Sequence, residues 1–476
     1  MNPSRDFEPS SANGFSTQVE AAVRNRPNTG SRIGIAFAPG VVDVMGGIGE
    51  DAGSLVLTAP TTLGHHTAVW PIAGDKIHIG MVSKTGAESG DTTFPASMLA
   101  SDDTAAICAR CDKSPWAAPT LMAIRRMIVD HIAAAPAGGL AILIEHDFPE
   151  NADLGRLPSQ VAAAASAFLK LQNVEAETMV VAQSCANVVA ELVDLQQLRK
   201  TMTALYTPSV RSIWQMRFHP NLLCEALELP QGVIIKAVAT RLTRPTTLKR
   251  LIETRVCSEM GHRIIQELQR QDGQNLDPAQ TRLSSITPAE YVERFRDRMP
   301  SKITHQQFTT KFGTVRGLGD GSANPKEVFK IRSRAEHHIY ENRRVHDFAT
   351  HIVRARRATT IEALMAAGEL MYASHWSHSQ RCGIGGVETD RLVNNIREFG
   401  EAAGLYGAKV TAGGEGGELV VLMRDDEQAH AALAKASAMA EEASNQPVVI
   451  FGGVRQGASR SVSADAARSP ATAGAV

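Results

Sequence analysis

Alternating apolar and polar positions predict that the first ninety residues are rich in β-strand. Strands are expected at 32–37, 54–59, 66–70 and 76–81. The sequence Ala38-Pro39-Gly40 is expected to end the first of them, because proline and glycine interrupt regular structure. Apolar residues at helical spacing predict a helix over 119–134, and a short apolar run predicts a buried strand over 140–144. An alanine-rich helix is expected from 159 to about 171, just after Pro158.

The rest of the chain alternates longer helical patterns with short strands. Helices are expected at 177–206, 248–270, 288–298, 334–354, 361–374, 389–402 and 427–443. Strands are expected at 232–238, 404–412, 418–423 and 447–451. The mixture predicts an α+β fold with an N-terminal domain over 31–245 and a C-terminal domain over 246–454. Residues 1–30 and 455–476 are polar and are expected to be disordered tails.

Composition narrows the class of function. The 476 residues carry 49 Lys and Arg against 50 Asp and Glu, a net charge of −1, so nucleic acid is not an expected partner. No apolar run approaches the roughly 18 residues of a membrane span, and no secretory signal pattern is seen. We therefore expect a cytoplasmic protein whose ligand is a small molecule. The sequence does not reveal the oligomeric state.

Three glycine-bearing segments, far apart in the chain, carry the candidate chemistry. They lie at 38–57 (APGVVDVMGGIGEDAGSLVL), 149–162 (PENADLGRLPSQVA) and 409–419 (KVTAGGEGGEL). A glycine loop that opens a helix can present backbone N–H groups to an anion, assisted by the helix dipole. Acidic residues beside such loops can accept hydrogen bonds from sugar hydroxyls.

Simpler interpretations stand beside these. The run 413–417 is also typical of a tight hairpin turn, and Glu50 and Asp51 are also typical of solvated loop acids. Cys108 and Cys111 form a CxxC pair without a second pair to complete a zinc site. The remaining feature is a group of histidines on predicted helices, interpreted as surface or core residues: His337, His338, His346, His375 and His378.

With these segments the chain resembles the GHMP family of small-molecule kinases, most closely its L-arabinokinase and galactokinase branch. The shared sequence motifs are Asp-Val-Met-Gly-Gly-Ile at 43–48, Ser-Leu-Val-Leu at 54–57 and the Gly-Gly-x-Gly-Gly turn at 413–417. Two further segments without glycine loops look similar, at 339–345 and 389–393. The resemblance spans about residues 32–455 and is weak over 145–330.

The resemblance implies a two-domain fold with the active site in the interdomain cleft. It implies ATP and Mg²⁺ as cofactors and transfer of a phosphoryl group to the anomeric hydroxyl of an aldose such as arabinose or galactose, a reaction governed by positioning and charge. Gly155 and Ser159 would bind phosphate, and Ser159 also the metal. The third segment would contribute Gly413, Gly414, Gly416 and Gly417 to the cofactor-binding site, where they would shape the cleft. The sugar would contact Asp43, Gly46, Glu50 and Asp51.

The chain departs from the family pattern where the reacting groups belong. Val41 stands at the family's Arg. If the second loop is two residues longer than in the family, Ala163 stands at the Mg²⁺-binding Glu, and an ungapped match back from Leu229-Pro230 places Thr201 at the catalytic Asp. No catalytic residue is therefore assigned, although Asp194 is the nearest acid and Arg156, Glu50 or Asp51 are conceivable substitutes. The leading hypothesis is an ATP-dependent sugar kinase homologue. The alternative is a catalytically impaired homologue, a pseudokinase that binds a sugar or nucleotide and regulates.

Overall fold

The computed structural model of the chain describes residues 12–30, 32–85, 89–149, 152–195, 197–206, 212–219, 222–240, 246–274, 277, 281–318, 324–358, 360–411, 417–445 and 447–452. Its helices are α1 (Ala12–Asn25), α2 (Met98–Ser101), α3 (Thr104–Arg110), α4 (Ala118–Val129), α5 (Arg156–Gln172), α6 (Thr178–Val193), α7 (Leu198–Tyr206), α8 (Thr246–Gln271), α9 (Pro288–Glu290), α10 (His305–Phe312), α11 (Ile331–Ala358), α12 (Ile361–Trp376), α13 (Val387–Phe399) and α14 (Glu427–Ser444). Its strands are β1 (Gly34–Met45), β2 (Val56–Ile72), β3 (Lys76–Ser83), β4 (Gly90–Pro95), β5 (Gly139–His146), β6 (Ser212–Arg217), β7 (Leu223–Glu228), β8 (Val233–Ala239), β9 (Ile303–Thr304), β10 (Val328–Phe329), β11 (Leu405–Val410), β12 (Glu418–Arg424) and β13 (Val449–Phe451).

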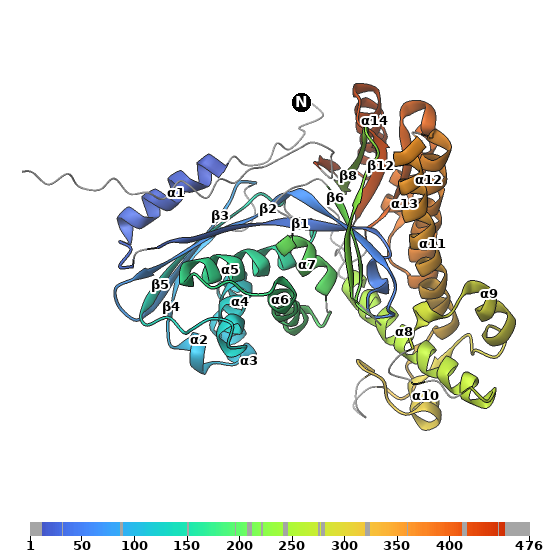
Figure 1. Cartoon of the computed structure of the whole chain (residues 1–476), viewed down its shortest axis with the longest axis horizontal. Coiled ribbons are helices and arrows are strands. Elements are labelled where there is room, and N and C mark those ends of the chain that lie inside the picture. The colour runs from blue at the N-terminus through green and yellow to red at the C-terminus, as the bar shows by residue number, and fades with distance from the viewer. Residues whose placement is uncertain are drawn as a thin grey trace, which may run out of the picture.

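A seven-stranded sheet forms the first part of the molecule. Its strands follow the order β4-β3-β5-β2-β6-β7, and β1 pairs with β2 beside this path. All pairs are antiparallel except β3 with β5. Helices α4 to α7 cover one face of the sheet and α1 lies on the other (Figure 1).

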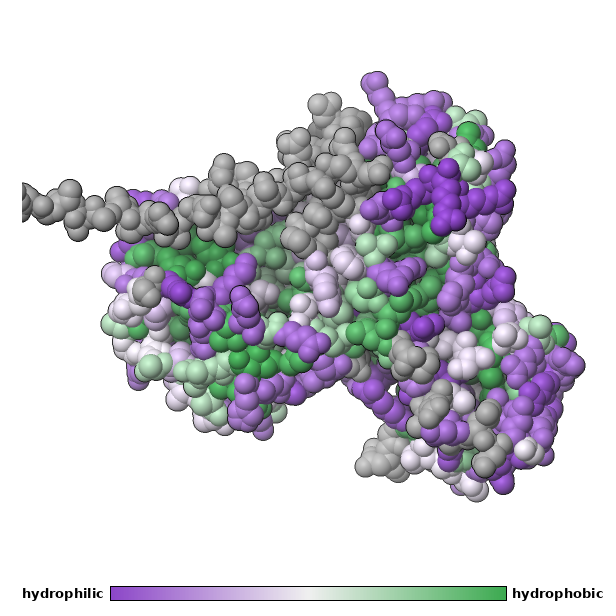
Figure 2. All heavy atoms as spheres, in the orientation of Figure 1, coloured by the Kyte–Doolittle hydropathy of each residue, from purple (hydrophilic) through white to green (hydrophobic). Residues whose placement is uncertain are grey.

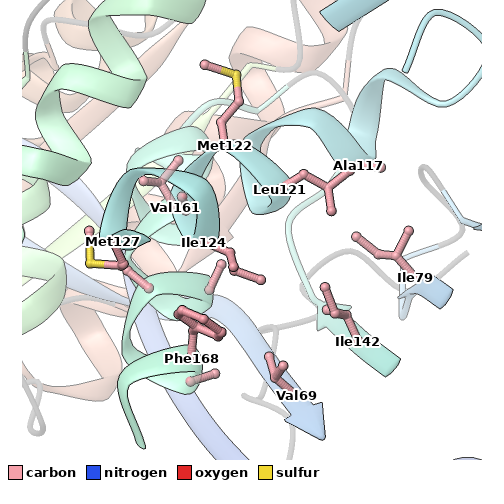
Figure 3. Packing of buried hydrophobic residues seen from close by; sticks show 14 of the residues in the cluster. Val69, Ile79, Ala117, Leu121, Met122, Ile124, Met127, Ile142, Val161 and Phe168 are labelled. Carbon is pink, nitrogen blue, oxygen red and sulfur yellow. The ribbon is translucent and has the colours of Figure 1, made fainter. Parts of the chain in front are cut away.

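The main core of this part lies between the sheet and helices α4, α5 and α6. Figure 3 shows Leu121 and Ile124 of α4 and Phe168 of α5 facing Val69 and Ile142 of the sheet. All five side chains are 3% exposed or less. Burial of each such side chain contributes about 1.5–3 kcal/mol to folding. This layer holds the first turn of α5, the second glycine segment, at a fixed place beside β1.

A four-stranded antiparallel sheet, in the order β11-β12-β8-β13, forms the second part. Helices α11 to α14 stand beside it (Figure 1). Strand β8 precedes the predicted domain boundary at 245, yet it pairs with β12 and β13 in this sheet. The second sheet therefore takes strands from both sides of that boundary, and the boundary itself stays a prediction.

Helices α8, α9 and α10 form a third group, at the lower right of Figure 1, around the aromatic core residues Tyr291, Phe295 and Phe308. Hydrophilic residues dominate the outer surface of this part in Figure 2. The segment predicted as a helix at 288–298 is a short α-helical turn, α9, followed by a π-helical turn over Tyr291–Phe295.

The α+β class is confirmed, and several local expectations are corrected. The first strand does not end at Ala38-Pro39-Gly40, because β1 runs through it to Met45 with register shifts at Pro39/Val41 and Asp43/Met45. The two strands expected at 54–59 and 66–70 are one strand, β2. Part of the expected N-terminal tail forms helix α1, because Phe15 and Val19 lie four residues apart and pack on Trp70.

Several elements of the structure were not predicted from the sequence, namely β4, α2, α3, β6, β7, β9, β10 and α10. Residues 1–11 and 453–476, the rest of the expected tails, lie outside the described part of the chain.

Candidate functional site

The first glycine segment continues into the loop that follows β1, and this loop lies against the second part of the molecule. Gly46 has a φ of 84°, which favours glycine, and a Cβ there would lie 2.7 Å from the carbonyl oxygen of Leu55. A 3-10 turn over Gly47–Gly49 follows and carries the chain to Glu50 and Asp51. Because Gly46 permits this turn, Asp43 at the end of the strand and Glu50 in the loop can meet the same partner.

That partner is Arg199, in the first turn of α7. Its Nε donates to Asp43 Oδ1 at 2.6 Å and its Nη2 to Asp43 Oδ2 at 2.9 Å. Its Nη1 donates to Glu50 Oε2 at 2.8 Å, and the Leu198 amide donates to Glu50 Oε1 at 3.0 Å. Two of the predicted sugar-contacting carboxylates therefore already hold hydrogen-bond donors on all four oxygens. Such a charge-assisted, bidentate pair is among the stronger polar contacts in proteins.

Burial and Arg199 act in opposite directions on the two carboxylates. Burial raises the pKa of Asp43, but the charge and hydrogen bonds of Arg199 outweigh it, so the pKa is lowered. For Glu50 burial outweighs Arg199, and the pKa is raised to about 7. Burial likewise raises the pKa of Asp51, against the charges of Arg255, Arg316 and Arg199. Asp43 is thus the firmly ionised partner of Arg199.

A second buried charge pair supports the loop from α11 and α12. Glu341 Oε1 accepts from the Gly46 amide at 3.3 Å and from the Ser374 hydroxyl at 2.5 Å, and Glu341 Oε2 accepts from Arg344 Nε at 2.7 Å. Glu341 is fully buried. Its pKa falls to about 2, because Arg344 and other positive neighbours together outweigh burial. The charge of Glu341 therefore fixes Gly46.

The third glycine segment lies against the same strand. The Asp43 amide donates to Thr411 Oγ1 at 2.8 Å, and the fully buried Lys409 donates to the carbonyl of Val410 at 2.7 Å. Gly417 has a φ of 67°, and a Cβ there would collide with Thr240. The predicted residues Gly413, Gly414 and Gly416 lie outside the described part of the chain.

The second glycine segment packs directly on β1. The Val41 amide donates to the carbonyl of Leu154 at 2.8 Å, and a Cβ on Gly155 (φ 70°) would lie 2.7 Å from the carbonyl of Val41. The hydroxyl of Ser159 donates to the carbonyl of Ala38 at 2.7 Å and lies 3.0 Å from His65 Nδ1. Ser159 is fully buried and its hydroxyl is used inside the protein. Its predicted role at phosphate and metal stays a prediction that this geometry does not favour.

An apolar cluster contains two of the positions that the resemblance assigns to the family's reacting charges. Its fully or almost fully buried members are Ala38, Val41, Ala162, Ala163 and Ala204. Val41 and Ala163, which the resemblance places at the family's Arg and Mg²⁺-binding Glu, thus share one cluster. These two side chains offer no oxygen donor to Mg²⁺.

The third family position also holds no acid. Thr201 is fully buried, and its hydroxyl donates to backbone carbonyls, including that of Ala182 at 3.1 Å. Asp194 ends α6 with its side chain 76% exposed, and its nearest cation is Arg255, at 3.6 Å from Nη2. In the described part of the chain, neither side chain forms a hydrogen bond or ion pair with Asp43.

A further acidic pair lies between the second and third segments. The Asp153 amide donates to Glu418 Oε1 at 2.9 Å, and Lys200 Nζ lies 3.6 Å from Asp153 Oδ2. Burial, and next the charge of Asp153, raises the pKa of Glu418 to about 8. Lys200 is 2% exposed, so α7 contributes two adjacent buried cations to this region, Arg199 and Lys200.

The histidines and cysteines form no metal centre in the described residues, where no group of three or more His, Cys, Asp or Glu is placed to hold a metal ion. His337 and His378 are fully buried, with ring centroids 4.5 Å apart. This agrees with the core interpretation for both residues. Cys108 is exposed, Cys111 is buried, and both are free thiols.

Sequence reasoning missed Arg199, Lys200, Glu341 and Lys409 as site residues. Glu341 and Lys409 lie within segments that already carried the family resemblance, so that signal was present. Arg199 carried none, because it lies in the weakly similar stretch and only the fold brings it within 2.6 Å of Asp43.

Comparison with known proteins finds similarity to two sugar kinases. The chain is 23% identical over 496 residues to an L-arabinokinase from Arabidopsis thaliana, covering 91% of this chain and 47% of that protein. It is 37% identical over 93 residues to a galactokinase from Mycobacterium bovis, covering 20% of this chain and 23% of that protein. The chain thus spans about half the length of the first relative and less than a quarter of the second.

The fold is similar to the crystal structure of a Lactococcus lactis galactokinase complexed with galactose. The TM-score is 0.67 at 18% identity, over 92% of this chain and 97% of that one. No protein-family model matches the chain. In the described residues, no helix is both long and apolar enough to cross a membrane.

Proposed function

From its membership of the GHMP kinase family, which its homology to L-arabinokinase and galactokinase shows, we propose that the chain is a sugar-binding pseudokinase. It binds a small sugar-like molecule beside the loop 46–53 and transfers phosphoryl groups poorly or not at all. We place it in the cytoplasm as part of the same proposal.

The observation that carries the proposal is the apolar cluster at Val41 and Ala163. Phosphoryl transfer depends on positioned charges around the transferred group. Removing one such oriented stabiliser typically costs on the order of 10²–10³-fold in rate. Two of the positions that the resemblance assigns to such charges are apolar and packed together, and the Ser159 hydroxyl donates to the carbonyl of Ala38.

The buried charges support a retained binding role. A buried Arg–carboxylate pair is not in itself a good device for stability, because desolvation offsets much of its attraction. Burial that raises the pKa of Glu50 to about 7 and of Glu418 to about 8 is typical of functional sites, although structural ion pairs produce it too. These groups lie around the first and third glycine segments.

A second function keeps its own supporting observation. Arg199 and Lys200 place two cations beside Asp43 and Asp153, and such groups could take over charge neutralisation from the missing Arg. The chain would then be an ATP-dependent sugar kinase that transfers the γ-phosphoryl group to the anomeric hydroxyl of an arabinose-like or galactose-like aldose, with Mg²⁺ supplied alongside ATP.

Two measurements on the same preparation separate the functions. Thermal unfolding is followed with D-galactose, L-arabinose and Mg²⁺-ATP, each alone and in combination, because a ligand that binds the folded state raises the melting temperature. Turnover is followed as ADP release with the same sugars. Stabilisation by a sugar without ADP release supports the pseudokinase. Sugar-dependent ADP release establishes the kinase. If a sugar produces neither stabilisation nor ADP release, both functions are contradicted.

A further inference from the structure

A cluster of arginines lies next to the predicted sugar loop, outside the contacts described so far. We call it the Arg255 cluster: Arg255 and Glu259 of α8, Arg282, Arg316 and Asp51. Arg316 is exposed, Glu259, Arg282 and Asp51 are half-buried, and Arg255 is 8% exposed. The cluster therefore reaches from solvent to a buried guanidinium at the edge of the loop.

Backbone contacts hold the cluster against the loop. The Ser284 amide donates to the carbonyl of Ala52 at 3.2 Å, and a Cβ on Gly53 would lie 2.9 Å from Arg282 Cγ. Gly317 has a φ of 80°, and a Cβ there would lie 3.0 Å from Arg255 Nη2. Glycine at these two positions lets the chain pass close to the arginine side chains.

Arg255 has hydrogen-bonding capacity that the described protein does not use. Its buried Nε has no hydrogen-bond partner among the described residues. Its nearest ion-pair contact is Asp194 at 3.6 Å, and that carboxylate is 76% exposed, so its charge is strongly screened by water. A buried, unpaired donor on a charged side chain is costly, and a bound acceptor would remove that cost.

The arginines of the cluster face several acids. Arg255, Arg282 and Arg316 lie near Asp51, Glu259 and the exposed Asp194, and burial raises the pKa of both Asp51 and Glu259. The two other acids of the loop region, Asp43 and Glu50, are held by Arg199. Asp43 and Glu50 are thus occupied, whereas the buried Nε of Arg255 has no hydrogen-bond partner among the described residues.

We infer that the sugar recognised beside the loop 46–53 carries an anionic oxygen group, a carboxylate or a phosphate, which binds Arg255 with Arg316 at the entrance. This inference rests on the proposed function, since it names the chemistry of that ligand. The hydroxyls of the sugar face the loop and its anionic group faces α8. Arginine suits this role because its planar donors match carboxylate and phosphate oxygens.

The test compares three sugars that differ at one position. Binding of D-galactose, D-galacturonate and D-galactose 6-phosphate to the full chain is measured by isothermal titration calorimetry. We expect at least one anionic sugar to bind about tenfold or more tightly than galactose, since hydrogen bonds to charged groups carry that much discrimination. Tighter binding of galacturonate identifies the anionic group as a carboxylate, and tighter binding of galactose 6-phosphate identifies it as a phosphate. We also expect the preference to shrink as salt is raised.

Variants locate the preference. Arg255→Gln should reduce it roughly tenfold, Arg255→Lys should keep part of it, and Arg250→Gln, an exposed arginine on the same helix, should leave it unchanged. Arg316→Gln, at an exposed position, should also reduce it and serves if Arg255→Gln does not fold. Preference unchanged in both Gln variants overturns the inference.

The sugars themselves separate the two levels of the proposal. Galactose that binds as tightly as both anionic sugars overturns this inference and leaves the proposed function standing. A chain that binds none of the three overturns the proposed function and this inference with it.

Discussion

Arg199 and Asp43, 156 positions apart in the chain, form two parallel hydrogen bonds of 2.6 and 2.9 Å. Both side chains are buried, and Glu50 takes the remaining Nη1 donor of Arg199 at 2.8 Å. The pair joins the first strand of the large sheet to α7, so it couples the packing of α7 to the loop that follows the strand.

Removal of the cation should therefore be costly. Arg199→Met leaves two buried carboxylates without their partner, and we expect the free energy of unfolding to fall by about 3–5 kcal/mol. Urea denaturation of the variant measures it. Arg110→Met, at a half-exposed ion pair with Asp102, is the control and should change stability by no more than about 1 kcal/mol. A loss of similar size in both variants would contradict this account of Arg199.

Restoring the family's arginine should not restore activity. Val41→Arg places an unpaired charge in the cluster with Ala163, against the backbone of Gly155, and should cost on the order of 3 kcal/mol or more of stability. Val82→Arg, at a position 39% exposed, should be nearly neutral. Thermal unfolding and ADP release are measured on both. A stable Val41→Arg protein that gains turnover would show that the cluster opens to accept charge.

Substitution of Ser159 distinguishes a structural role of its hydroxyl from a nucleotide-binding role. Ser159→Ala leaves the buried carbonyl of Ala38 without its hydroxyl partner, so we expect a loss of about 1–3 kcal/mol in unfolding free energy. Any stabilisation by Mg²⁺-ATP should be unchanged. The exposed Ser101→Ala is the matched control. Unchanged stability together with lost ATP binding would assign Ser159 to the cofactor instead.

The pH dependence of stability should report Glu418. Its pKa is about 8 in the folded chain against 4.5 as the ordinary value, so the folded state binds more protons between these limits. Its contribution is complete below pH 4.5 and is lost as pH rises toward 8. Relative to Glu418→Gln, the wild type should lose up to about 1.4 kcal/mol per pH unit within this window.

Urea denaturation of wild type and Glu418→Gln at pH 5, 7 and 9 measures this difference. Glu398→Gln, at an exposed position on α13, supplies the control and should run parallel to the wild type. A free energy of unfolding that rises with pH in the wild type relative to Glu418→Gln would contradict this prediction. It would show that the buried carboxyl is stabilised in its charged form.

The sequence was sufficient for the α+β class and for most long helices, because their apolar spacing is local. The element ends at Pro39-Gly40 were mispredicted, since the long partner strand β2 carries β1 through residues that usually break a strand. Phe15 and Val19 of α1 gave a weak signal that only Trp70, supplied by the fold, makes meaningful.

For the site, the resemblance led to Asp43, Glu50 and Asp51 but not to what faces them. Arg199 and Arg255 lie in stretches where the family likeness is weak, and pairing across 150 or more residues leaves no local pattern. Val41 and Ala163 could be recognised as departures from the family pattern. That they pack into one cluster is a property of the fold.

Strands β1 and β2 have a mechanical consequence for the two sheets. One core cluster unites Val42 of β1 and Leu57 of β2 with Ile235 and Val420 of the second sheet, and the Thr62 amide donates to the carbonyl of Gly452 at 3.4 Å. A hinge motion between the two sheets would have to break the apolar contacts of this shared core. Strands β1 and β2 therefore join the two sheets through one packed core, which opposes a change in the angle between them.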